Sequence, residues 1–104
     1  MIIKISKENF KNEIETSDKL IILNFSSQWC SPCKMIAPII DEITTENSLI
    51  KSCKVNIDEE LEITQQFKIM SIPTILIIKN NEILQRIVGY KSKPALLKII
   101  NKYI

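Results

Sequence analysis

Hydrophobic and polar positions along the chain change their spacing several times, and these changes predict alternating strands and helices. Short runs that are continuously apolar or alternate in polarity are typical of strands, and they cover residues 2–5, 20–25, 51–57, 74–78 and 82–88. Between them, apolar residues recur at helical spacing and predict four helices, beginning at Lys7, at the segment 30–33, after Asp58 and at Pro94. The order β-α-β-α-β-α-β-β-α predicts an α/β fold, with a mixed sheet of about five strands flanked by helices.

Turn and cap residues support several of these boundaries. Ser6 and Asp58 each stand directly before a predicted helix, where a side-chain oxygen can cap the free backbone N–H groups. Asn80 and Asn81 tolerate the positive φ of a tight hairpin turn between the last two strands. Pro94 suits the first turn of the last helix because its missing N–H is not needed there.

Length and composition narrow the class of protein. We expect one domain over residues 1–104, since 104 residues suffice for a core. The net charge of +2 gives no strong bias toward nucleic acid or membranes, and no apolar run approaches the ~18 residues of a membrane-spanning helix. The first residues lack the pattern of a signal peptide, so we expect a monomeric cytoplasmic protein. The lysines near the C-terminus favour a solvated helix face over a nucleic-acid patch: Lys91, Lys93, Lys98 and Lys102.

The candidate chemistry lies in the segment Trp29-Cys30-Ser31-Pro32-Cys33-Lys34, which follows a predicted strand and opens a predicted helix. In that context, Cys-x-x-Cys indicates dithiol redox chemistry. The free N–H groups at a helix N-terminus stabilise a thiolate, so we expect Cys30 to be exposed and to attack disulfides. Cys33 lies one turn further in, where it can resolve the mixed disulfide. Pro32 suits the first helical turn.

Metal binding fits the cysteines less well. A structural zinc ion takes four nitrogen or sulfur ligands, whereas the chain has one further thiol, Cys53, and no histidine. A permanent disulfide between Cys30 and Cys33 would close too small a loop to stabilise the fold much. Cys53 itself allows two interpretations, a small buried hydrophobic residue in a strand or a regulatory or dimerising thiol.

The whole chain resembles the thioredoxin family. The cysteine motif is similar to the family's Trp-Cys-Gly-Pro-Cys-Lys, and Met35 to Glu42 looks like the family's kinked helix. Lys54 to Asp58 resembles the strand whose lysine approaches the active site, and Gly89 falls on the glycine after the last strand. Ile72-Pro73-Thr74 resembles the loop whose proline is cis and faces the cysteines.

This resemblance implies the thioredoxin fold and a protein-disulfide reductase. Cys30 would be the nucleophile and Cys33 the resolving cysteine, and a thioredoxin reductase would restore the dithiol with electrons from NADPH. We expect no metal and no bound cofactor, and the implied partners are that reductase and disulfide-containing client proteins. A client would lie extended beside Pro73, as an added strand. The residues that we expect to bind it are Trp29, Ser31, Pro32, Ile72, Gly89 and Tyr90.

The chain departs from the family pattern at several positions. Asn24 stands where the family usually has a buried Asp that helps to deprotonate the second cysteine, so Lys54 would lack its carboxylate partner. Asn cannot take up a proton, so it cannot replace this function of the Asp. The alternative interpretation is that Asn24 simply satisfies a buried hydrogen bond. Ser26 replaces the first of two active-site tryptophans. Ser31 adds a hydroxyl that could cap the helix or bond a thiolate. Tyr90 replaces a small residue, and either narrows the choice of clients or is a surface aromatic.

Two other functions remain open on the same fold. A dithiol oxidase or isomerase would use the same cysteines, but we find no export signal. A non-catalytic binding subunit would use the surface as a platform, and the intact pair Cys30 and Cys33 argues against it.

Overall fold

Five strands form one mixed sheet in the computed structural model, which describes residues 2–104. The strands are β1 (Ile2–Lys4), β2 (Leu20–Ser26), β3 (Ile50–Asn56), β4 (Thr74–Lys79) and β5 (Glu82–Val88). Their order in the sheet is β1-β3-β2-β4-β5. The strands β1, β3 and β2 run parallel to one another, β4 pairs antiparallel with β2, and β5 pairs antiparallel with β4. The predicted mixed α/β sheet and its element order are confirmed.

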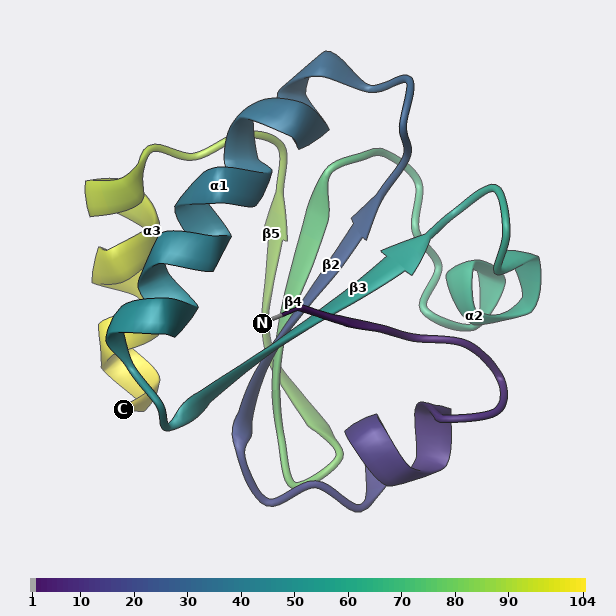
Figure 1. The fold of residues 1–104 in the computed structure, drawn as a ribbon, viewed down its shortest axis with the longest axis horizontal. Helices are drawn as coiled ribbons and strands as arrows, with labels where there is room; N and C mark the ends of the chain where they lie inside the picture. Colours follow the sequence, from purple (N-terminus) through teal and green to yellow (C-terminus); the bar gives the residue numbers. More distant parts are fainter. Residues whose placement is uncertain (1) are drawn as a thin grey trace.

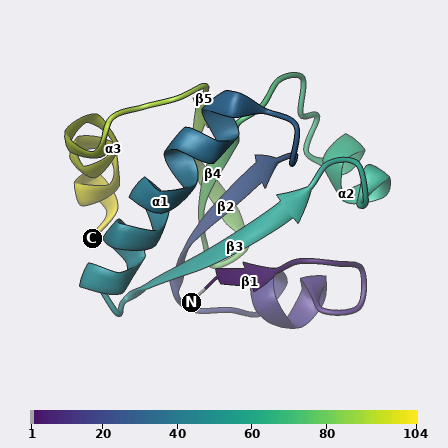
Figure 2. The same ribbon diagram turned by 45° about the horizontal axis from the view of Figure 1, so that its top comes forward.

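The helices lie on both faces of the sheet (Figures 1 and 2). Helices α1 (Ser31–Glu46) and α3 (Lys93–Ile100) cover one face, with the short 3₁₀ turn η2 (Asn101–Tyr103) after α3. Helix α2 (Leu61–Gln66) and the π-helical segment η1 (Lys11–Glu15) cover the other. Every residue of β2 is buried, as expected for a central strand covered on both faces.

Alternation along the central strands decides which side chains point toward α1. Leu20 and Ile22 pack in the core beneath α1 and α3, and the two-residue period of a strand extends this row to Asn24 and Ser26. Asn24 pairs in register with Lys54 of β3, which belongs to the same row. The register therefore gathers polar side chains under the first turns of α1, at the end of the sheet where the cysteines lie.

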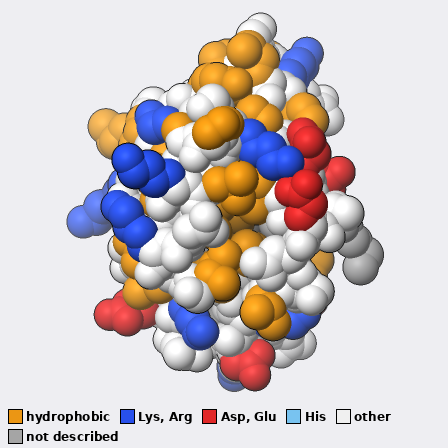
Figure 3. Space-filling view, turned by 90° about the vertical axis from the view of Figure 1, so that its left-hand side faces the viewer, with side chains coloured by type: hydrophobic (Ala, Val, Ile, Leu, Met, Phe, Trp, Pro, Cys, Tyr) orange, Lys and Arg blue, Asp and Glu red, His pale blue; other side chains and the backbone are white. Residues whose placement is uncertain are grey.

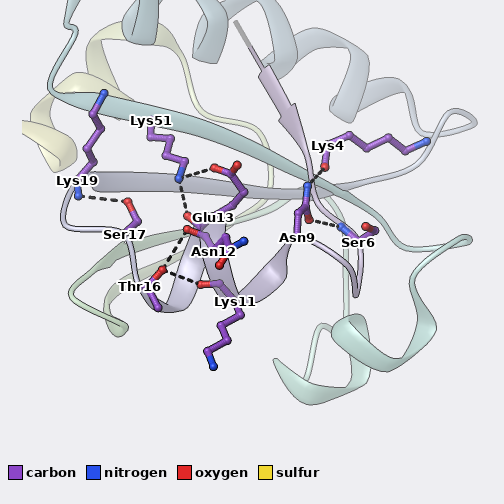
Figure 4. Close-up of polar contacts among 10 residues, drawn as sticks. All are labelled: Lys4, Ser6, Asn9, Lys11, Asn12, Glu13, Thr16, Ser17, Lys19 and Lys51. Atoms are coloured by element: carbon purple, nitrogen blue, oxygen red, sulfur yellow. Dashed lines mark hydrogen bonds and ion pairs between the residues drawn. The ribbon is translucent and has the colours of Figure 1, made fainter.

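The first helix begins later than predicted. Residues 7–9 form a turn, and the helical segment η1 starts at Lys11, so the prediction of a helix capped by Ser6 and beginning at Lys7 is wrong. The polar contacts of this turn come from the side chain of Asn9, drawn in Figure 4: its Oδ1 accepts from the Ser6 N–H at 2.8 Å, and its Nδ2 donates to the Lys4 carbonyl at 2.8 Å. Within residues 2–104, no side chain caps the start of η1.

The cap predicted at Asp58 is also wrong. Asn56 Oδ1 accepts from the backbone N–H groups of Asp58 at 2.9 Å and of Glu59 at 3.3 Å, which closes a turn. Helix α2 then starts at Leu61 without a side-chain cap. The Asp58 carboxylate instead accepts a hydrogen bond from the Trp29 indole in the candidate site.

The hairpin and the last helix follow their predicted signals. Asn80 and Asn81 have φ values of 52° and 62°, as the tight turn requires. Ser92 Oγ caps α3 by accepting from the Ala95 N–H at 3.3 Å, and Pro94 lies in the first turn.

The surface over α1 and α3 supports the interpretation of a solvated face. Lys93 forms ion pairs with Glu42 at 3.4 Å and with Glu46 at 3.0 Å, both on α1. Figure 3 shows the basic side chains of this side interspersed with hydrophobic and neutral groups. No helix within residues 2–104 is both long and apolar enough to cross a bilayer.

Candidate active site

The cysteine motif lies where β2 ends and α1 begins. Cys30 is the extended residue before α1, and its Sγ accepts from the Cys33 backbone N–H at 3.3 Å. The sulfur of Cys30 thus occupies the capping position, and the expectation that Ser31 caps the helix is wrong because Ser31 is already the first helical residue. Negative charge on this sulfur is stabilised by that N–H group and by the positive end of the helix dipole.

The surroundings of Cys30 come from two distant loops. Cys30 Sγ lies 3.9 Å from the Ile72 carbonyl oxygen, to which its thiol donates. The Ile72–Pro73 peptide bond is cis, as predicted, and the Pro73 carbonyl accepts from the Gly89 N–H at 2.8 Å. Cys30 is 6 % exposed, which is less than we expected, so only the edge of its sulfur reaches the surface.

Cys33 is held in its protonated form. Burial, and after it the hydrogen bond with Cys30, raise the pKa of the Cys33 thiol to about 11. The backbone N–H of Ser27 and the positive charge of Lys54 lower this pKa in part. Near neutral pH, Cys33 must therefore lose a proton before or while its sulfur attacks.

Asn24 lies beneath the motif with an unpaired oxygen. Its side chain is 5 % exposed, and its Oδ1 has no hydrogen-bond partner among residues 2–104. The alternative that Asn24 simply satisfies a buried hydrogen bond finds no partner for this oxygen within the described protein. Lys54, its neighbour on β3, is exposed at the rim.

The rim around Cys30 exposes an aromatic surface. Trp29 is 69 % exposed, and its Nε1 donates to Asp58 Oδ2 at 2.9 Å. Tyr90 is also exposed, next to Gly89, whose φ of +87° is a conformation that favours glycine. Ser31 and Pro32 are exposed, Ile72 is half-buried and Pro73 is buried.

Three residues of the site were not identified from the sequence in the roles they have here. Asp58 orients Trp29, and the hydroxyls of Ser26 and Ser27 are buried without hydrogen-bond partners among the described residues. A signal for the two serines was present, because polar residues end an otherwise apolar buried strand.

Comparisons with known proteins agree with one another along the whole chain. A family model described as Thioredoxin matches residues 1–102. This chain belongs to the thioredoxin family. It is 41 % identical over 105 residues to the thioredoxin of Listeria monocytogenes, with all of both chains covered, and 38 % identical over 104 residues to that of Bacillus subtilis, covering 99 % of this chain and 98 % of the relative. The crystal structure of the thioredoxin NaTrxh from Nicotiana alata matches with a TM-score of 0.88 at 31 % identity, covering 98 % of this chain and 91 % of that chain.

Membership of the thioredoxin family settles the class of reaction. The chain is a thiol–disulfide oxidoreductase that acts as a protein-disulfide reductase. Thioredoxins need no bound cofactor, and within residues 2–104 no three Cys, Asp or Glu side chains gather as metal ligands would. Cys30 and Cys33 fit the Cys-x-x-Cys motif of this family.

Proposed function

We propose that the protein reduces disulfides of client proteins in the reducing cytoplasm, with Cys30 as the nucleophile and Cys33 as the resolving cysteine. The observation that carries these roles is the hydrogen bond from the Cys33 N–H to Cys30 Sγ at 3.3 Å. This bond places Cys30 Sγ at the positive N-terminal end of α1, while burial keeps the Cys33 thiol protonated.

The reaction proceeds in two exchanges. The Cys30 thiolate attacks one sulfur of the client disulfide, a mixed disulfide forms and the other client sulfur leaves as a thiolate. Cys33 then loses its proton and attacks Cys30 Sγ, so that the Cys30–Cys33 bond forms and the bond to the client breaks. The client gains two electrons and takes up two protons from solvent. A thioredoxin reductase, using NADPH, returns the dithiol.

Client binding would use the rim around Cys30. An extended segment beside Pro73 could pair with the backbone of Ile72, as in the addition of a strand. The exposed indole of Trp29, held by Asp58, would cover one side of the segment, and Gly89 and Tyr90 the other.

An insulin-reduction assay with NADPH and a thioredoxin reductase tests this proposal. We expect Cys30→Ser to abolish turnover and Cys33→Ser to accumulate a mixed disulfide, whereas Cys53→Ala keeps the activity because Cys53 lies in the opposite core. If the reduced protein failed to reduce insulin, the proposed disulfide-reductase activity would be wrong. Retention of biological activity by a variant lacking both Cys30 and Cys33 would favour a binding subunit instead.

A further inference from the structure

A hollow opens to the surface behind Cys33, away from the rim proposed to bind clients. Its volume is about 450 Å³, and it lies between the end of β2, the first turns of α1 and β3. Neither Cys30 nor any residue of the proposed client surface lines it. The lining residues are Ser26, Ser27, Gln28, Cys33, Lys34, Ala37 and Lys54.

Unpaired polar atoms surround this hollow. Ser26 Oγ, Ser27 Oγ and Asn24 Oδ1 are buried and have no hydrogen-bond partner among residues 2–104. Buried polar atoms nearly always bond to protein or to ordered water. A second cavity of about 30 Å³ is lined by Asn24 and shares Ala37 and Lys54 with the hollow. That space exceeds the roughly 10–15 Å³ that one water needs, so a water fits in the cavity lined by Asn24.

The side chains that face the hollow include no proton acceptor of their own. Its two charged side chains are cations, Lys34 from α1 and Lys54 from β3, and the two serines come from the end of β2 and the residue after it. Cys33 nevertheless has to release a proton when its sulfur attacks. The Asn24 amide cannot accept it, so the proton goes to solvent or to the departing client thiolate.

We propose that this hollow, which Ser26 and Ser27 line together with Cys33, is the route by which the proton of Cys33 leaves to solvent through water. In this step the Cys33 S–H bond breaks and the Cys30–Cys33 bond forms. The proton passes to water in the hollow and from there to bulk solvent, while the second client sulfur leaves as a thiolate. The inference rests on the proposed roles of the two cysteines, and it makes Ser26 a positioning residue that acts through water.

Two variants of Ser26 separate the effect of the open hollow from the effect of the serine hydroxyl. Ser26→Leu fills the hollow with an apolar side chain, whereas Ser26→Ala keeps the opening and removes only one hydroxyl. Thr44→Ala is the control, because Thr44 is a buried residue of α1 that carries a hydroxyl and lines neither cavity. Urea unfolding of each variant shows whether the fold is retained.

A stopped-flow reaction of the reduced protein with dithiobis(nitrobenzoate) separates the two exchanges. Attack by Cys30 releases a first thionitrobenzoate, and attack by Cys33 on the resulting mixed disulfide releases a second. Imidazole and inorganic phosphate are added at fixed pH and ionic strength, because small bases that reach Cys33 accelerate only the second release.

We expect the second release to accelerate with either base in the wild type and in Thr44→Ala. In Ser26→Leu this acceleration should fall at least about fivefold, with the first release unchanged, and in Ser26→Ala about twofold. Lys54→Gln should weaken the effect of phosphate more than that of imidazole, since it removes a cation from the hollow.

The same traces distinguish failure of the inference from failure of the proposed function. Equal acceleration in the wild type and Ser26→Leu, or no acceleration in the wild type, would overturn the proton route while leaving the cysteine roles intact. If Cys33→Ser also gave two releases, or Cys30→Ser kept the fast first release, the roles themselves would be wrong.

Discussion

Replacing Asn24 by Asp places a carboxyl group where the structure offers no hydrogen bond to the oxygen of the native amide. The position is 5 % exposed and Oδ1 is unpartnered among residues 2–104. Burial of this kind raises the pKa of a carboxyl group by about 3 units. At about 1.4 kcal/mol per unit, ionised Asp at this position costs about 4 kcal/mol of unfolding free energy. Lys54, the neighbour in register, offsets about 1–2 kcal/mol, which leaves a net loss of about 2–3 kcal/mol.

The size of this loss in unfolding free energy depends on pH. A carboxyl group whose pKa is raised in the folded state holds its proton more tightly there, so stability is lost as the pH rises from the unfolded to the folded pKa. Urea unfolding of Asn24→Asp should therefore show a small loss at about pH 4 and the full loss at about pH 8. Adding Lys54→Gln should enlarge the loss at the higher pH by about 1–2 kcal/mol beyond the sum of the single changes.

Asn56→Asp is the matched control. Asn56 is also buried on the edge of this region, but its Oδ1 accepts two backbone N–H groups, from Asp58 and Glu59. A carboxylate there keeps both bonds, and we expect its cost to stay below about 1 kcal/mol.

Asn24→Asp should speed the reaction of Cys33, although it lowers the stability of the fold. Asp at position 24 can take the proton of Cys33 through the water beside it, so we expect the release due to Cys33 to accelerate by up to about tenfold near neutral pH. The release due to Cys30 should not change. Unfolding free energies that do not vary with pH, together with unchanged release by Cys33, would refute this account of Asn24.

Three further predictions concern the thiols and the rim. Iodoacetamide at neutral pH should label Cys30 before Cys33 and Cys53, read by peptide mapping, and earlier labelling of either of the others would contradict the assignment. Burial raises the pKa of Cys53 from 9.0 to about 11, so the thiol ionises at lower pH in the unfolded chain, and the unfolding free energy should fall as the pH rises between these values. Cys53→Ala should reduce this loss at alkaline pH by about 2 kcal/mol. An equally steep fall in urea melts of Cys53→Ala and of the wild type would refute this prediction. Trp29→Ala should raise the KM for insulin severalfold and shift the unfolding free energy by less than about 1 kcal/mol, because the indole is mostly exposed. Asp58→Ala should show a weaker KM effect of the same sign, and an unchanged KM in both variants would remove the rim from client binding.

Local features of the fold were predictable from the sequence because local chemistry determines them. The period of apolar residues identified every strand, Asn80 and Asn81 predicted the hairpin turn, and the position of Cys30 and Cys33 after a strand predicted a dithiol at a helix start. The errors arose at the starts of two helical segments. At both, an Asn side chain and not the expected Ser6 or Asp58 bonds the nearby backbone N–H groups, and sequence position alone does not identify which polar side chain does so.

The groups around Cys33 were decided by the tertiary structure. Asn24, Ser26 and Lys54 become neighbours only through the register of β2 with β3, and they face Cys33 only because α1 packs on that face. Pairing register and helix packing depend on the whole core, in which Ile22, Ile36 and Ile75 are fully buried together. The sequence by itself thus determined the reacting sulfurs and the elements that carry them, whereas packing between distant segments determined which polar groups and how much water can reach the second sulfur.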